Sequence, residues 1–166
     1  MTPRYTATYL SPLGPIVIES DGTSLTGLRF IDDVNAVSAG QSAAVQDVPV
    51  LTQTLRWLDD YFAGCQPHIL PRLNPHGTAF QRRVWQALFS IPYGQTCTYV
   101  GIARLVGCRS PQAVGQALTR NPIALIIPCH RVIAAHGSLG GYAYGLHRKR
   151  QLLQLESFGL GVRHDY

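Results

Sequence analysis

Three prolines fall within the twelve residues Gln66-Pro-His-Ile-Leu-Pro-Arg-Leu-Asn-Pro-His-Gly77, and this stretch separates two differently patterned parts of the chain. Proline lacks a backbone N–H and has a fixed φ, so neither a helix nor a central strand runs through such a segment. The 166 residues are enough for one domain or for two small ones that share a core. We predict two domains, residues 1–74 and residues 75–166.

The first part has the short, β-branched runs and turn signals of an antiparallel meander. Asp21-Gly22 is a hairpin signal, and Ser11-Pro-Leu-Gly14 is a second turn. The predicted strands are Tyr5–Leu10, Pro15–Glu19 and Leu25–Ile31. Residues 32–49 are weakly periodic, which favours a loop or a marginal helix. A helix is predicted from about Val50 to Phe62, because one helical face collects Leu51, Leu55, Leu58 and Phe62.

The second part is mostly helical by the same criteria. Thr78 and Thr98 stand where helix caps are expected, and Gly107 stands where a helix would stop. Two short helices around that glycine predict a helix-turn-helix. The apolar run Ala124–Ile127 reads as a buried strand. The predicted helices are those that begin after Thr78, then Tyr99–Val106, Gln112–Arg120 and Leu146–Phe158. The fold class is therefore α/β of the α+β type, a sheet domain with a helix followed by a helical domain.

Charge is distributed unevenly between the two parts. Residues 1–75 hold four basic and seven acidic residues, a net charge of −3, whereas residues 76–166 hold ten basic and two acidic residues, a net charge of +8. A basic domain of this kind is typical of proteins that bind a polyanion such as nucleic acid. A basic surface that only maintains solubility is the alternative.

Cysteine spacing and hydropathy exclude several classes of protein. The four cysteines form no C-x-x-C pair, so a zinc knuckle or a thioredoxin-type site is not supported. No apolar run approaches the roughly 20 residues that span a bilayer, and the N-terminus lacks a basic region followed by an apolar stretch. We expect free thiols in a reducing, cytoplasmic compartment, no membrane association and no cofactor.

Cys129 is the thiol with the most suggestive neighbours. An ordinary cysteine is only a few per cent thiolate at neutral pH, and an adjacent base or cation increases that fraction. His130 and Arg131 follow it directly, and Pro128 restricts the backbone before it. The alternative is an inert cysteine packed in the core after an apolar run.

The segment Asn121-Pro-Ile-Ala-Leu-Ile-Ile-Pro-Cys-His-Arg-Val-Ile133 resembles the active-site signature of the O6-alkylguanine-DNA alkyltransferases, whose centre reads Pro-Cys-His-Arg-Val. The resemblance covers about half the chain, with the motifs in the same order. It extends from about Phe80 to Glu156 through Phe80-Gln-Arg-Arg-Val-Trp85, Ile91-Pro-Tyr-Gly94, Thr98-Tyr99, Ala113-Val-Gly115, Gly141-Tyr142 and Arg148-Lys149.

The resemblance implies a catalytic role for each of five residues. Cys129 would accept the alkyl group from O6 of guanine, His130 would act as its base through a water, and Glu156 would orient His130. Asn121 would hold the turn before the nucleophile. Tyr99 would donate its hydroxyl to the guanine leaving group and help rotate the nucleotide out of the stack.

The resemblance also implies double-stranded DNA containing O6-alkylguanine as the partner. The helix-turn-helix would enter the minor groove, where the small residues Ala113 and Gly115 allow close approach to the DNA backbone. The protein would act once per molecule, as a monomer in solution that can cluster on DNA. Residues expected to contact DNA or the lesion also include Arg109, Gln112, Arg120, Arg131, Tyr142 and Tyr144.

Three departures from the family pattern carry predictions. Gln112 stands where the family usually has an arginine that fills the gap left by the flipped base, so we expect weaker DNA binding or slower flipping. Tyr144 stands where many relatives have glycine, which predicts a narrower pocket. Residues 1–64 contain neither Cys nor His, so we expect none of the structural zinc that some relatives hold.

Three other interpretations remain. An alkyltransferase-like sensor would bind the lesion without transfer, although such proteins typically replace the reactive cysteine. A transcriptional regulator would use the helix-turn-helix alone, but the chain shows no dimerisation segment. A Cys-His hydrolase would act on a small ester or peptide, without DNA and with turnover.

Overall fold

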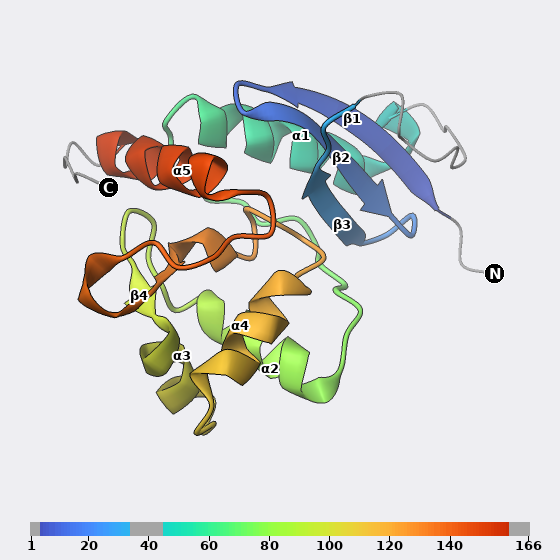
Figure 1. Ribbon diagram of the computed structural model, residues 1–166. Coiled ribbons are helices and arrows are strands. Elements are labelled where there is room, and N and C mark those ends of the chain that lie inside the picture. Colours follow the sequence, from blue (N-terminus) through green and yellow to red (C-terminus); the bar gives the residue numbers. More distant parts are fainter. Residues whose placement is uncertain (1–3, 34–44, 160–166) are drawn as a thin grey trace. The chain divides into compact units, whose positions relative to one another are not determined.

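The computed structural model describes residues 4–33 and 45–159 (Figure 1). The chain divides into two compact units. The first comprises residues 1–76 together with 122–124, and the second comprises residues 77–121 and 125–166. A three-stranded antiparallel sheet with a helix makes up the first unit, and helices dominate the second. This arrangement confirms the predicted α+β class.

The sheet of the first unit is the predicted meander. Its strands are β1 (Tyr5–Ser11), β2 (Gly14–Ser20) and β3 (Leu25–Phe30), paired antiparallel in sequence order. The central strand is buried on both faces, because Ile16, Val17 and Ile18 have no exposed surface. Such a strand reads as a continuous β-branched run rather than as an alternation.

The helix of the first unit, α1 (Pro49–Phe62), buries a face slightly different from the predicted one. Leu51 and Leu58 are fully buried as expected, but Leu55 and Phe62 are only half-buried. The buried face turns instead toward Trp57 and Tyr61, whose stacked rings lie 5.1 Å apart between centroids. Of the segment predicted as a loop or marginal helix, residues 34–44 lie outside the described residues, and Val45–Asp47 form a 3-10 turn, η2.

In its described residues, 77–121 and 125–159, the second unit contains four α-helices, three of which have well-defined N-caps. They are α2 (Ala79–Leu88), α3 (Tyr99–Leu105), α4 (Pro111–Thr119) and α5 (Leu146–Gly159). Thr78 forms a reciprocal capping box with Gln81, and the Thr98 hydroxyl accepts a hydrogen bond from the Gly101 N–H at 3.0 Å. Both predicted caps are therefore confirmed, and the third, on α4, is Ser110.

The pair α3 and α4 forms the predicted helix-turn-helix around Gly107, whose φ of 69° ends α3. Trp85 fixes α4 against α2, because its indole Nε1 donates to the Ala117 carbonyl oxygen at 2.8 Å. A short parallel pair, β4 (Cys97–Thr98) and β5 (Val132–Ile133), joins the start of α3 to the segment after Cys129.

The predicted strand at Ala124–Ile127 is wrong. Only Ile123 makes a bridge, to Leu28 of the first unit, and residues 124–126 then form a turn. Leu125 has a φ of 67°, a left-handed conformation that no regular strand contains. The apolar run predicted burial correctly, but a short apolar run does not distinguish a strand from another buried segment.

Helix length and polarity bear on membrane association. None of the helices in residues 4–33 and 45–159 is both long and apolar enough to cross a membrane.

Candidate active site

Cys129 sits at a sharp turn of the second unit. Pro128, with φ −82° and ψ 63°, has the conformation of the central residue of an inverse γ-turn, and the Cys129 N–H donates to the Ile127 carbonyl oxygen at 2.8 Å. A 3-10 turn, η3 (Cys129–Arg131), follows immediately. The turn leaves Cys129 only 6% exposed.

Asn121 braces this turn from the end of α4. Its side-chain Nδ2 donates to the Ile127 carbonyl oxygen at 2.9 Å, and its side chain also bonds to the Cys129 thiol. Burial raises the pKa of that thiol, whereas Asn121, the positive charge of Lys149 and nearby backbone N–H groups offset part of the rise. The thiol is therefore protonated at rest and needs a base before it can act as a nucleophile.

His130 and Glu156 form a fully buried pair beside the nucleophile. The His130 Nε2 bonds to Glu156 Oε2, and Arg131 Nε donates to Glu156 Oε1 at 2.7 Å. The Gly94 N–H also donates to Oε1, at 3.2 Å. Burial alone would raise the pKa of Glu156, but the charges and hydrogen bonds of His130 and Arg131 outweigh it and lower the pKa to about 2.

The charges of this cluster favour a neutral His130 that can act as a base. Burial lowers the pKa of His130 below its ordinary value, although the Glu156 carboxylate acts in the opposite direction. Arg131 donates to the same carboxylate, and its charge and hydrogen bond also favour the ionised form of Glu156. A neutral His130 that donates Nε2–H to Glu156 has Nδ1 as its proton acceptor.

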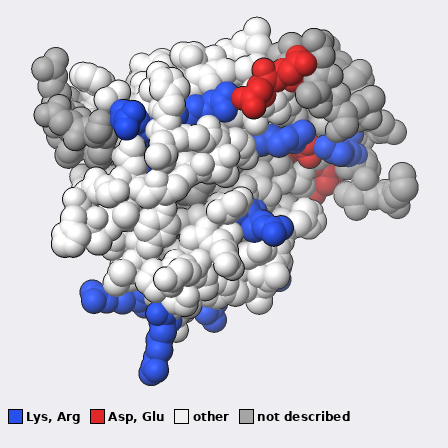
Figure 2. Space-filling model, in the orientation of Figure 1, with Lys and Arg blue, Asp and Glu red and all other residues white. Residues whose placement is uncertain are grey.

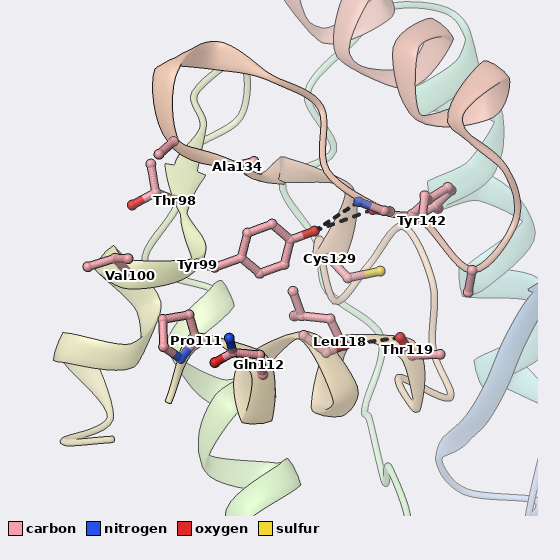
Figure 3. A pocket seen from close by; sticks show the side chains of 14 residues that line it. Thr98, Tyr99, Val100, Pro111, Gln112, Leu118, Thr119, Cys129, Ala134 and Tyr142 are labelled. Carbon is pink, nitrogen blue, oxygen red and sulfur yellow. Dashed lines mark hydrogen bonds between the residues drawn. The ribbon is translucent and has the colours of Figure 1, made fainter. Parts of the chain in front are cut away.

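A cavity of about 580 Å³ opens onto the Cys129 side chain, and all of its lining residues belong to the second unit. Figure 3 shows Tyr99 and Cys129 at the same part of this cavity, with Gln112, Leu118 and Thr119 of α4 along one side. The lining also includes Thr98, Val100, Pro111, Gly115, Ala134, Ala135, Gly141, Tyr142 and Ala143.

Tyr99 is held by the loop that precedes α5 and contains Gly140 and Gly141. The Gly141 N–H donates to the Tyr99 hydroxyl oxygen at 3.2 Å. Gly140, with a φ of 71°, lies so close that an added Cβ would meet this oxygen at 2.7 Å. No other residue type fits there without moving Tyr99.

Sequence reasoning gave Lys149 no role, yet the structure buries it completely beside the cavity. Its ammonium donates to the carbonyl oxygens of Val132, at 2.6 Å, and Gly141, at 2.9 Å. Burial lowers its pKa to about 8, partly offset by Cys129. The only signal in the sequence was its place in the Arg148-Lys149 motif.

The remaining predicted residues lie in different surroundings. Gln112 and Gly115 line the Cys129 cavity, whereas Ala113 and Arg120 line a second hollow of about 740 Å³ between α2 and α4. Arg109 is exposed in the turn between α3 and α4.

Of three further predicted residues, one contacts the buried His130–Glu156 pair and two lie at the Tyr142 side of the Cys129 cavity. Arg131 donates to Glu156 through Nε and to the Ile91 carbonyl oxygen through Nη1, the latter at 3.0 Å. Tyr142 lines the cavity, and Tyr144 packs edge-on against its ring with centroids 5.6 Å apart.

The surface of the second unit is strongly basic. Between residues 77 and 159 the only acidic residue is Glu156, which is buried, so no carboxylate side chain is exposed in the described part of this unit. On the face shown in Figure 2, the side chains over α3 and α4 include blue but no red atoms. Six arginines are exposed: Arg82, Arg83, Arg104, Arg109, Arg120 and Arg150.

The described residues offer no cluster of side chains that could bind a metal ion. Within residues 4–33 and 45–159, no three or more His, Cys, Asp or Glu side chains are grouped so that they could hold a metal ion.

Two protein-family descriptions match the chain. Residues 79–158 match the DNA binding domain of 6-O-methylguanine DNA methyltransferase, and residues 4–69 match the ribonuclease-like domain of the same family. Together the two matches leave little of the chain unassigned.

Individual relatives agree with these matches. The methylated-DNA–protein-cysteine methyltransferase of Mycobacterium leprae is 45% identical over 147 residues, 88% of each chain. That of Methanosarcina acetivorans is 44% identical over 153 residues, 92% of this chain and 97% of its own. A crystal structure of Mycobacterium tuberculosis OGT in complex with DNA superposes with a TM-score of 0.81 at 39% identity, covering 93% of this chain and 94% of that one.

Proposed function

Because the chain belongs to the 6-O-methylguanine DNA methyltransferase family, we propose that it repairs DNA by transferring an alkyl group, chiefly methyl, from O6 of guanine to Cys129. The observation that carries this proposal is a nearly buried thiol that opens into a cavity, with a buried His130–Glu156 pair next to it. The thioether formed is stable, so each molecule acts once.

The proposed transfer is a single displacement at the alkyl carbon. His130 takes the thiol proton through a water, and Glu156 with Arg131 stabilises the imidazolium that forms. The Cys129 sulfur then bonds to the carbon as the carbon–O6 bond breaks, and the electron pair remains on guanine. The Tyr99 hydroxyl donates to the guanine as this charge develops.

A buried sulfur cannot reach a guanine that is stacked in a duplex. The nucleotide must be flipped into the cavity, at a cost of a few kcal/mol. Exposed arginines and the absence of exposed carboxylates on the described second unit support DNA as the partner. We expect binding that is largely independent of sequence and weakens as salt increases.

The proposal also covers the division of the chain into domains, its compartment and its oligomeric state. Residues 75–166 would hold the DNA-binding and transfer functions, and residues 1–74 would form the separate sheet domain. The protein would act in the cytoplasm as a monomer that can cluster on DNA. The basic surface of the second unit supports the first part, since the exposed arginines and the Cys129 cavity belong to one unit.

The direct test is the mass of the intact protein after mixing with a duplex that contains one O6-methylguanine. We expect a gain of one methyl group, located by peptide mapping at Cys129 and not at Cys65, Cys97 or Cys108. The matched control is the same duplex with unmodified guanine. Tight lesion binding without a mass gain would favour the sensor interpretation, and neither binding nor gain would favour the hydrolase.

Gln112 gives a prediction about DNA affinity. Its side chain lines the cavity in the first turn of α4 and is uncharged. A Gln112→Arg variant is expected to bind the lesion duplex several-fold more tightly, with the salt dependence steeper by about one phosphate contact. Fluorescence anisotropy at several salt concentrations measures both. Gln53→Arg, on α1, adds the same charge elsewhere, and equal gains in the two variants would contradict a specific role for position 112.

Tyr144 gives a prediction about the size of the alkyl group. Its edge-on contact restrains the Tyr142 ring, which lines the cavity. We expect the wild type to react readily with O6-methylguanine in DNA but slowly with free O6-benzylguanine. A Tyr144→Gly variant frees the Tyr142 ring to move and so makes room for the benzyl group. We expect this variant to react with free O6-benzylguanine at least about tenfold faster than the wild type. Fast labelling of the wild type would disprove the narrow pocket.

A further inference from the structure

Lys149 is a charged group buried next to the reaction centre, and in the described part of the chain its ammonium donates to two carbonyl oxygens rather than to a carboxylate. It has no exposed surface, and its ammonium is satisfied by the carbonyl oxygens of Val132 and Gly141. Desolvating an ammonium is costly, so a lysine in this position is expected to do something that a neutral residue could not.

The Gly141 carbonyl oxygen is approached by two donors. Lys149 Nζ lies 2.9 Å from it, and the Tyr99 hydroxyl lies 3.5 Å from it. A strong O–H···O bond is about 2.7 Å long, so the contact from Tyr99 is weak, whereas the contact from the ammonium is charge-assisted. Lys149 is therefore the main partner of this carbonyl.

The Tyr99 oxygen is fixed from another direction. It accepts from the Gly141 N–H at 3.2 Å, and Gly140 packs against the ring without room for a Cβ. The Lys149 ammonium also lies 5.9 Å from the centre of the Tyr99 ring, within the range of a cation–π contact. The ring and its oxygen are held in place, while the hydroxyl proton has no strong acceptor in the loop.

We propose that Lys149 is a positioning residue for Tyr99: by occupying the Gly141 carbonyl, it leaves the Tyr99 hydroxyl proton available to the base in the cavity. This inference rests on the proposed alkyl transfer and assigns part of it. Without the ammonium, the Tyr99 hydroxyl would turn its proton to the Gly141 carbonyl and be a poorer donor to the substrate.

A double-mutant cycle tests the inference. Single-turnover methyl transfer from the lesion duplex is measured for the wild type, Lys149→Met, Tyr99→Phe and the double variant. Methionine is similar in length to lysine and lacks the donor and the charge. We expect Lys149→Met to slow transfer at least about fivefold more in the wild-type background than in the Tyr99→Phe background, because the phenylalanine has no proton to orient. Arg56→Met, which removes an exposed charge from α1 of the first unit, should transfer at the wild-type rate.

A second readout separates positioning from a general effect on the thiol. Iodoacetamide alkylates Cys129 without needing Tyr99, so Lys149→Met should change this rate by the same factor in both backgrounds. Equal slowing of methyl transfer in both backgrounds would overturn the inference while leaving the transfer function intact. A wild type that alkylates with iodoacetamide but accepts no methyl from DNA would contradict the proposed function, and the inference with it.

Discussion

A Glu156→Gln variant is expected to lose about 3 kcal/mol of unfolding free energy and to transfer methyl about 100-fold more slowly. The carboxylate is fully buried and bonds to both His130 and Arg131. A neutral amide leaves the Arg131 charge without its partner and no longer stabilises the imidazolium. Urea denaturation and single-turnover transfer measure the two effects.

Lowering the pH should remove the stabilisation that ionised Glu156 gives to the wild-type protein. The pKa of Glu156 is lowered to about 2, so its stabilisation is fully present above its ordinary pKa of 4.5 and is lost as the pH falls toward 2. The pH dependence of unfolding between these values should be shallower in Glu156→Gln.

Glu19 offers a matched control. It also pairs with two arginines, Arg4 and Arg29, but its side chain is 16% exposed, against 1% for Glu156, and both arginines are more exposed still. Glu19→Gln should cost no more than about 1 kcal/mol and leave transfer unchanged. A loss as small as this in Glu156→Gln, with an unchanged transfer rate, would contradict the role given to the buried pair.

Cys129→Ser is expected to abolish transfer while retaining lesion binding within about twofold of the wild type. A serine hydroxyl is similar in size and keeps a partner for Asn121, but it is far less acidic and nucleophilic than a thiol. The variant should therefore form a long-lived complex with methylated duplex, seen by gel shift, with no gain of mass. Cys65→Ser and Cys97→Ser should transfer normally. A methyl group on the Cys129→Ser protein would place the acceptor elsewhere.

Elements with strong local signals were predictable from sequence. The meander has its turns at Gly14 and after Asp21, and the caps Thr78 and Thr98 begin α2 and α3. The strand prediction for Ala124–Ile127 is wrong because apolar side chains indicate burial but not backbone conformation, and Leu125 is left-handed. The buried face of α1 also depends on aromatic packing that spacing alone does not reveal.

In the candidate site too, residues with a local sequence signal were predictable and residues placed by distant contacts were not. Cys129, His130 and Asn121 lie in one short segment, so a motif could indicate them together. Lys149 could not be recognised in this way, because its acceptors lie 17 and 8 residues earlier in the chain. A lysine in the first turn of a basic helix looks exposed until its tertiary partners are known.

Residues 122–124 complete the first unit although they follow α4 in the chain. The Leu28 N–H donates to the Pro122 carbonyl oxygen and the Ala124 N–H donates to the Leu28 carbonyl oxygen, each at 2.9 Å. The chain is synthesised from the N-terminus. The pairing of residues 122–124 with Leu28 therefore cannot form until α2, α3 and α4 have left the ribosome. A nascent chain released before residue 124 would leave the Leu28 backbone unpaired, so only chains that have nearly reached the nucleophile can complete the sheet.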